Sequence, residues 1–393
     1  MWSTAICWLS CISLVISTDV TLYGSTANGW EFVRDLFREN FVQERDTGSS
    51  IAIYHQGRLV VDLVGGWFDT SKTKPYDNET LQLIFSTSKS LVAIAAALCV
   101  QRGLLDYSEL VTHYWPEYGQ NGKENTTVAD ILSHRAGLPD LFVSSFDQYL
   151  NWTTMIDLLQ QERPVWLPGS AQGYHAFTYG WLAGELVRRV DPQKRTIGEF
   201  IREEITNRIQ TEFYIGLPQE FEQRVSPLIF TDIEDILNAS MLEIYHFHNE
   251  ARTHQAEIPA ANGITNARSL AAIFGSLMTN IDERRDSRLL EPGILQRATT
   301  LNTLPNEIDI TFKIPFPVGM GFMLYEQDFP MFGPNSFGHS GAGGSIVFAA
   351  PAKNFSFAYV MNRCSFTPLT INNPRIGMIL NRTGRMLDKN QLN

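Results

Sequence analysis

Cysteine is scarce in this sequence, which argues against a fold held together by disulfide bonds. Four cysteines occur in 393 residues, and two of them, Cys7 and Cys11, fall in an apolar leader. The remaining two are too few for a disulfide scaffold. We therefore expect Cys99, in an apolar helix, and Cys364, after a strand-like stretch, to be buried free thiols.

Positive charge is also in short supply. The chain has 31 Lys and Arg residues against 42 Asp and Glu, a formal net charge of -11 at pH 7. Nucleic acids and anionic membranes attract basic faces, so this balance argues against either as a partner. The chain has 393 residues, of which 44% are hydrophobic, so it can bury a large core.

The longest apolar stretch at the N-terminus, residues 5–16, is too short to span a membrane comfortably. It is followed by short residues, and residues 1–17 therefore predict a secretory signal peptide. Because no Lys or Arg precedes the stretch, a signal anchor is the alternative. We expect a secreted glycoprotein, since six Asn-x-Ser/Thr sequons occur, at Asn78, Asn125, Asn151, Asn238, Asn354 and Asn381.

Strand-like segments lie near both ends of the mature chain, and helical patterns dominate between them. Residues 51–67 predict two strands around a turn, and strands return at 319–327, 345–350 and 355–361. Helices are expected at 29–40, 91–100, 128–134, 153–161, 181–190, 265–279 and near 376–388. The 91–100 segment is apolar on every side, which predicts a helix buried inside the domain.

This order predicts an α+β fold in which a mixed, largely antiparallel sheet is completed by distant segments and flanked by helices. We expect residues 18–393 to form one domain of two lobes. The sheet lobe comprises about 18–104 and 265–393, and an inserted, mainly helical lobe comprises about 105–264.

Two Ser-x-x-Lys patterns are present, and their contexts differ. Ser71 and Lys74 lie in a polar turn, whereas Ser86 and Lys89 lie between an apolar strand and the apolar helix. Positions three apart share a helix face, so Lys89 would hold its amine beside the Ser86 hydroxyl. The Ser86 amide, at the start of a helix, is a candidate oxyanion donor. Burial at this junction should lower the lysine pKa.

The sequence FSTSK at 85–89, followed by an apolar helix, resembles the serine β-lactamase and penicillin-binding-protein superfamily. Further local matches resemble class C-like members, namely the bacterial family VIII carboxylesterases and animal β-lactamase-domain proteins. These matches are GLLD at 103–106, YWPE at 114–117, ILSHRAGLP at 131–139 and WLPG at 166–169. The resemblance covers nearly the whole mature chain and implies a β-lactamase/transpeptidase-like fold.

The resemblance also implies a second motif, Tyr-x-Asn, whose counterpart here is Tyr174-His175-Ala176. It gives Tyr174 the role of working with Lys89 as general base, and it places His175 near the substrate. Ala176 departs from the family pattern, because the family's asparagine helps to hold the amide side chain of β-lactams. This departure favours simple esters.

The third family motif is Lys-Thr-Gly on a strand edge, and its counterpart is His339-Ser340-Gly341. The resemblance implies that these three residues contact substrate and that the Ala342 amide is the second oxyanion donor. Histidine in place of lysine weakens the fixed positive charge that would bind a carboxylate. It again favours neutral acyl groups.

Competing interpretations are less consistent with the sequence. An α/β-hydrolase elbow at Ser340 would require a later histidine, and none follows it. A metal site at His246, His248 and His254 lacks the spacing of metallohydrolase signatures, and we expect these residues to lie in a solvated loop. A catalytically idle relative that binds or forms filaments would not need Ser86, Lys89 and Tyr174 together.

We therefore expect a serine acyl hydrolase that acts on small esters or amides through an acyl-enzyme, without a metal or organic cofactor. A β-lactamase or D-aminopeptidase-like amidase is the alternative within the same class.

Overall fold

The computed structural model describes residues 20–230 and 239–390. The signal-peptide prediction, Cys7, Cys11 and the sequon at Asn238 lie outside these residues.

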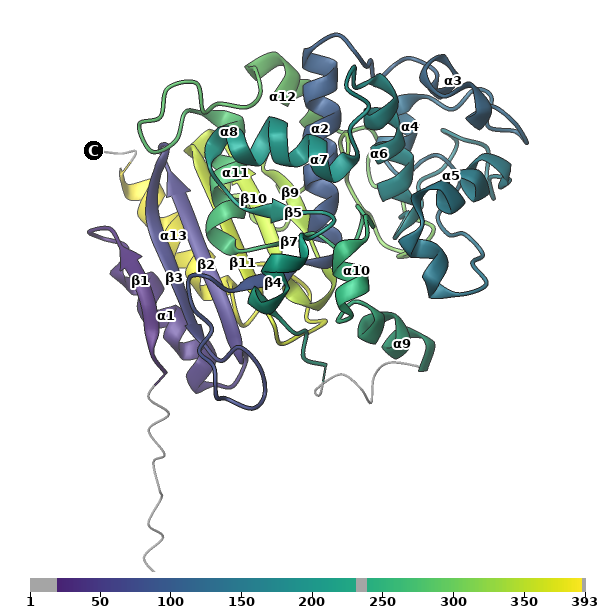
Figure 1. Ribbon diagram of the computed structural model, residues 1–393. Helices are drawn as coiled ribbons and strands as arrows, with labels where there is room; N and C mark the ends of the chain where they lie inside the picture. Colours follow the sequence, from purple (N-terminus) through teal and green to yellow (C-terminus); the bar gives the residue numbers. More distant parts are fainter. Residues whose placement is uncertain (1–19, 231–238, 391–393) are drawn as a thin grey trace, which may run out of the picture.

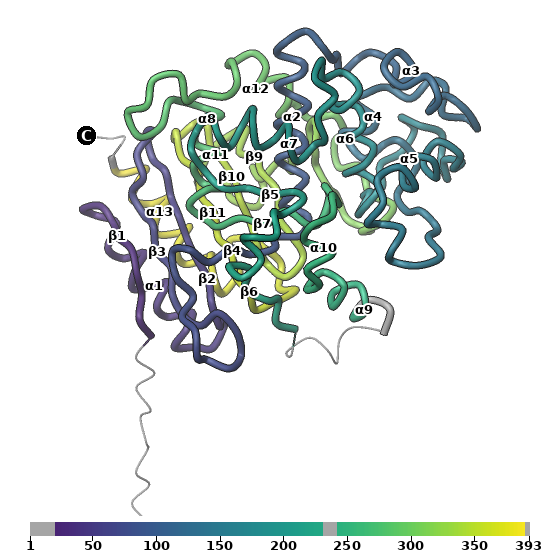
Figure 2. The backbone as a smooth tube through the Cα atoms, in the orientation of Figure 1, coloured from purple at the N-terminus to yellow at the C-terminus, as the bar shows by residue number. Residues whose placement is uncertain are grey.

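The larger of two sheets in the described residues has seven strands, in the order β1-β3-β2-β11-β10-β9-β8. Every neighbouring pair in it is antiparallel. Strands from the two ends of the chain lie side by side, which Figure 2 shows as purple next to yellow. The α+β fold with a sheet completed by distant segments is thereby confirmed. The strands are β1 Leu22–Thr26, β2 Gly48–His55, β3 Arg58–Gly66, β8 Met323–Leu324, β9 Phe337–Ser340, β10 Ile346–Ala350 and β11 Phe355–Met361.

The alternation of side chains along the strands determines what covers each face. Ile51 and Ile53 of β2 pack into one core with α1 (Glu31–Val42) and α13 (Gly377–Asn390). Ala52 and Tyr54 point to the other face, where α11 (Ala267–Met278) lies across β2, β10 and β11. The sheet is thus covered on both faces (Figure 1).

Helix α2 (Lys89–Gln101) lies in the interior of the structure, and residues 89–100 are all buried. It packs against α6 (Thr178–Val190) and α12 (Pro292–Thr299). An apolar helix surrounded by protein explains why residues 91–100 show no polar face. In Figure 1 this helix stands between the large sheet on one side and α6 on the other.

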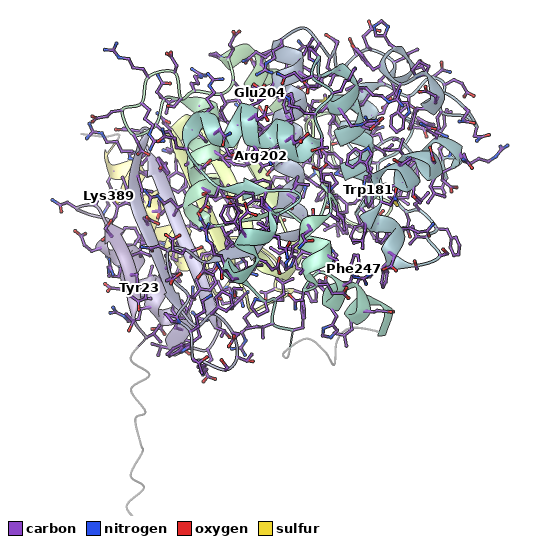
Figure 3. All side chains as sticks on the ribbon, viewed as in Figure 1. Tyr23, Trp181, Arg202, Glu204, Phe247 and Lys389 are labelled. Atoms are coloured by element: carbon purple, nitrogen blue, oxygen red, sulfur yellow. The ribbon has the colours of Figure 1, made fainter. Side chains whose placement is uncertain are left out.

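Helix α6 packs against the short helices of residues 111–201, and its Trp181 lies on the side of the molecule away from Tyr23 and Lys389 (Figure 3). The helices between the predicted lobe bounds are α3 Val111–Tyr114, α4 Val128–Leu132, α5 Trp152–Gln161, α6, α7 Ile197–Ile201, α8 Asn207–Ile209, α9 Ala239–Phe247 and α10 Ala251–Gln255, with a π-helical turn at Arg202–Thr206. A second sheet, with the order β5-β7-β4-β6, joins β5 Phe213–Tyr214, β7 Ile264–Thr265, β4 Leu81–Leu83 and β6 Val225–Ser226. The sequence does not indicate this sheet, because strands of two or three residues carry no periodicity.

Two smaller expectations can be compared with the structure. The strand predicted over 319–327 is reduced to Met323–Leu324, because tight turns flank it on both sides. Cys99 and Cys364 are buried free thiols, as predicted. Within residues 20–230 and 239–390, no helix is long and apolar enough to cross a membrane.

Candidate active site

Ser86 lies on a 3₁₀ turn, Phe85–Ser88 (η1), immediately before α2. The sequence predicted that the α-helix starts at Ser86, but it starts at Lys89. Phe85 has a left-handed backbone with φ of 48°, which turns the chain sharply between β4 and the helix. The Gly263 amide donates to Ser88 Oγ at 2.8 Å and fixes the turn against β7. This conformation leaves Ser86 half-buried at the wall of a cavity.

Lys89 is fully buried, and its amine lies 3.0 Å from Ser86 Oγ. The same Nζ donates to the carbonyl oxygens of Ala176 at 2.7 Å and Ala260 at 3.0 Å. A neutral amine has two N–H groups and one lone pair. In the structure, Nζ donates to Ser86 Oγ and to both carbonyls. Once the amine loses a proton, its two remaining N–H groups can stay on the carbonyls, and its lone pair is then free to accept the Ser86 hydroxyl proton.

Burial lowers the pKa of Lys89 well below its ordinary value, because the charged amine would lose its hydration. Burial likewise raises the pKa of Tyr174, although a hydrogen bond with Ser86 partly offsets this rise. Both shifts favour the neutral forms. The Lys89 amine is therefore easier to deprotonate than an ordinary lysine, whereas Tyr174 is held as a neutral phenol, which differs from the general-base role that the resemblance implied for it.

Tyr174 reaches this site from the segment before α6. Lys89 Nζ lies 4.8 Å from the centre of the Tyr174 ring. The ring stacks on Phe312 at 4.7 Å between centroids and lies 4.7 Å from the ring of His134. The structure thus brings Ser86, Lys89 and Tyr174, which the sequence predicted as the catalytic residues, into one place.

The His339-Ser340-Gly341 stretch forms the end of β9 and the start of a second turn, Ala342–Gly344 (η7), which contacts η1. Gly341 permits this contact, because a Cβ there would lie 2.2 Å from the carbonyl oxygen of Ile84. These three residues, Ala342 and Ser86 all line the cavity. The Ser86 and Ala342 amides, the predicted oxyanion donors, thus belong to two turns in direct contact.

His339 lines the cavity but is almost completely buried. Burial first, and then the neighbouring Lys89, lower its pKa to about 3. The ring is therefore neutral at physiological pH, and its Nδ1 lies 2.7 Å from the Ser340 carbonyl oxygen. It provides a polar wall without a positive charge.

His175 was predicted to contact substrate, and the structure does not support this role. Its Nε2 accepts the Leu138 amide at 3.0 Å, so its Nδ1 carries the proton and donates to the Gly173 carbonyl at 2.6 Å. The ring is fully buried and is not part of the cavity wall. His175 instead ties the segment that carries Tyr174 to residues 134–138.

His134 is a positioning residue that the sequence analysis did not single out. Its Nδ1 accepts the His175 amide at 3.1 Å, and its ring packs between Tyr174 and Tyr179. Burial and the surrounding basic groups keep its pKa well below the ordinary value. The ILSHRAGLP stretch was the available signal, but it did not indicate which side chain faces the site.

The cavity has a volume of about 770 Å³, and Phe, Tyr, Ile, Leu, Pro and Met side chains form most of its wall. Among the described residues that line it there is no Lys or Arg, and Asp328 is the only Asp or Glu. Burial raises the pKa of this half-buried carboxyl group. The cavity therefore suits an uncharged, largely apolar ligand.

The histidines considered as metal ligands are not in a solvated loop, contrary to our expectation. They belong to α9, α10 and the short connection between them, and His248 and His254 are buried. His254 contacts Glu222 at 2.9 Å and the His248 carbonyl at 2.8 Å, while the His248 ring lines the cavity. Within the described residues, no group of three or more His, Cys, Asp or Glu side chains could hold a metal ion.

Comparison with known proteins agrees with this geometry. The β-lactamase family model matches residues 33–377. The esterase/β-lactamase LipL of Mycobacterium tuberculosis is 31% identical over 367 residues, which cover 87% of this chain and 83% of that protein. The crystal structure of a family VIII carboxylesterase superposes with a TM-score of 0.84 at 29% identity, covering 93% of this chain and 100% of that one. EstA from Arthrobacter nitroguajacolicus Rue61a gives a TM-score of 0.79 at 28% identity, with 93% and 98% covered.

Proposed function

The chain belongs to the β-lactamase family and is a serine hydrolase related to esterases, and we propose that it hydrolyses uncharged esters through an acyl-enzyme formed on Ser86. The observation that carries this proposal is the 3.0 Å contact between Ser86 Oγ and a fully buried Lys89 amine at the wall of an apolar cavity. That contact provides a nucleophile and its base without any rearrangement.

In acylation, Ser86 Oγ attacks the ester carbonyl while its proton moves to the neutral Lys89 amine. The amides of Ser86 and Ala342 stabilise the negative oxygen of the tetrahedral intermediate. When the intermediate collapses, the Tyr174 hydroxyl gives its proton to the departing alkoxide, and Lys89 returns a proton to Tyr174. The charges of Lys89 and Tyr174 therefore exist only during the reaction.

Deacylation uses the same groups. A water molecule takes the place of the alcohol, gives its proton to the neutral Lys89 amine and attacks the acyl carbonyl. Ser86 is the leaving group and recovers its proton from Lys89, which completes the cycle without a metal or an organic cofactor.

The cavity favours esters over β-lactams and peptides that end in a carboxylate. Ala176 contributes its carbonyl to Lys89 but has no side-chain amide to hold a β-lactam. His339 is neutral, and Asp328 would repel an anionic substrate.

Secretion with N-glycosylation is part of this proposal, because the sequons at Asn78, Asn125 and Asn151 are exposed. Expression in an animal cell tests it. A secreted chain that shifts in mobility after treatment with peptide-N-glycosidase supports it, whereas a membrane-retained chain supports the signal anchor.

The enzymatic proposal is tested with a panel of short p-nitrophenyl esters, a chromogenic cephalosporin and D-amino-acid amides. We expect the wild-type protein to hydrolyse the esters and to hydrolyse the cephalosporin and the amides more slowly. Ser86→Ala should hydrolyse none of them. Ser71→Ala, in the other Ser-x-x-Lys pattern, is the matched control and should retain full activity, because Ser71 is exposed and hydrogen-bonds locally to Asp69. A wild-type protein that hydrolyses none of these substrates would contradict the proposal.

A further inference from the structure

The loop between α12 and β8 exposes an unusual number of large apolar side chains. They are 41–65% exposed, and we call them the apolar rim: Leu301, Leu304, Ile308, Ile310, Phe312 and Ile314. The neighbouring segment 164–169 adds strongly exposed Val165 and Leu167. Arg135 ties that segment to the loop, since it contacts Glu307 and donates to the Gly169 carbonyl.

The two acidic residues of this loop, Glu307 and Asp309, are largely buried, whereas the residues of the apolar rim are exposed. Asp309 is fully buried, and its Oδ1 accepts the amides of Thr311 and Phe312, each at 2.8 Å. Glu307 accepts the Leu304 amide at 2.9 Å and pairs with Arg135. Burying carboxylates and exposing isoleucines are both unfavourable in water. The loop is therefore ordered in a way that presents an apolar surface.

This surface is continuous with the candidate active site. Phe312 and Ile314 line the cavity and are also exposed, so they lie at its mouth. Phe312 additionally stacks on Tyr174. Whatever covers the apolar rim therefore meets the entrance through which substrate reaches Ser86.

The charges near the rim restrict the kind of surface it can meet. In residues 301–316 the only basic residue is Lys313, and the whole chain carries a net charge of -11. An anionic membrane attracts clusters of basic residues, and this loop has none. A protein bound permanently across Phe312 and Ile314 would close the cavity, whereas a lipid phase can itself contain the apolar ester.

We propose that the apolar rim docks the enzyme on a zwitterionic lipid surface, from which an apolar ester passes directly into the cavity. The docking step stands on the loop alone, and the entry of substrate rests on the proposed esterase function. The proposal narrows the substrate class from uncharged esters to esters that partition into lipid.

Flotation with phosphatidylcholine vesicles tests the docking step. The rim variant Leu304→Ser/Ile308→Ser/Ile310→Ser removes three exposed side chains that do not line the cavity. A matched control, Tyr23→Ser/Val42→Ser/Met378→Ser, removes exposed side chains from β1, α1 and α13. We expect wild type and control to float, and vesicle affinity of the rim variant to fall at least about tenfold.

Turnover separates docking from chemistry. The rim variant should hydrolyse a water-soluble p-nitrophenyl acetate at the wild-type rate but lose activity on emulsified tributyrin. Wild type that stays out of the lipid fraction, or that floats only with phosphatidylserine, would overturn the proposal. The proposal would also be overturned if the rim variant floated like wild type but changed from dimer to monomer in light scattering, because the rim would then be an interface between two copies of the chain. If wild type does not hydrolyse the soluble ester, the esterase proposal is refuted instead. The flotation result alone then decides whether the rim docks on lipid.

Discussion

Gly341→Ala tests whether the contact between the two turns sets the geometry of the active site. A Cβ at this position would lie 2.2 Å from the Ile84 carbonyl oxygen and 2.9 Å from Thr87 Oγ1. An ordinary contact of a Cβ is about 3.4 Å or longer, so η7 must move by about 1 Å away from η1. The Ala342 amide moves with it, away from the oxyanion.

A misplacement of about 1 Å lowers the rate about 100-fold, so we expect kcat for a short ester to fall by about two orders of magnitude. KM should change little, because the apolar wall that binds the acyl group stays in place. Thermal unfolding followed by circular dichroism checks that the variant folds.

Gly293→Ala is the matched control, because a Cβ at Gly293 would meet no atom within 4 Å and its backbone is not left-handed. It should match wild type in kcat, and because Gly293 lies in α12, where alanine is the better helix former, it should be at least as stable as wild type. The reasoning is refuted if folded Gly341→Ala retains kcat within about threefold of wild type, since the amide of residue 342 would then not stabilise the oxyanion.

Three other predictions concern charge. The lowered pKa of Lys89 means that kcat/KM rises as the amine deprotonates and levels off well below pH 10.5; a rise centred near 10.5 in a pH-rate profile would contradict this. Between the lowered pKa of folded Lys89 and the ordinary value of 10.5, the unfolded state binds a proton that the folded state does not, so the free energy of unfolding rises with pH in this range. Lys89→Met should abolish this rise, measured by urea denaturation, and should also abolish activity. Asp328→Asn should raise turnover of a chromogenic cephalosporin about 3- to 10-fold, because it removes a partly screened carboxylate from the cavity. It should leave turnover of neutral esters unchanged. The exposed control, Glu326→Gln, should change neither rate.

The elements with a strong hydrophobic pattern were predictable from the sequence. The strand at 355–361 matches β11 residue for residue, because it crosses the centre of the sheet and is buried on both faces. The apolar helix after Ser86 was equally clear, because a helix with no polar side must be enclosed. The contact between Lys89 and Ser86 was also predictable, because it depends only on two positions three residues apart in a helical segment.

Features that depend on distant contacts were not predictable. The left-handed Phe85 is stabilised by the surrounding turn, and a phenylalanine gives no local signal for that conformation. The burial of His248 follows from the packing of α9 against the cavity wall, although its polar neighbours suggested solvent. Likewise, only the fold shows that Asp309 is inside and Ile308 outside.

Peptide mapping of the protein after fluorophosphonate labelling tests the central claim most directly. The account predicts a single stoichiometric adduct on Ser86, absent in Ser86→Ala and strongly slowed in Lys89→Met. An adduct on any other residue, or undiminished labelling of Ser86→Ala, would contradict it.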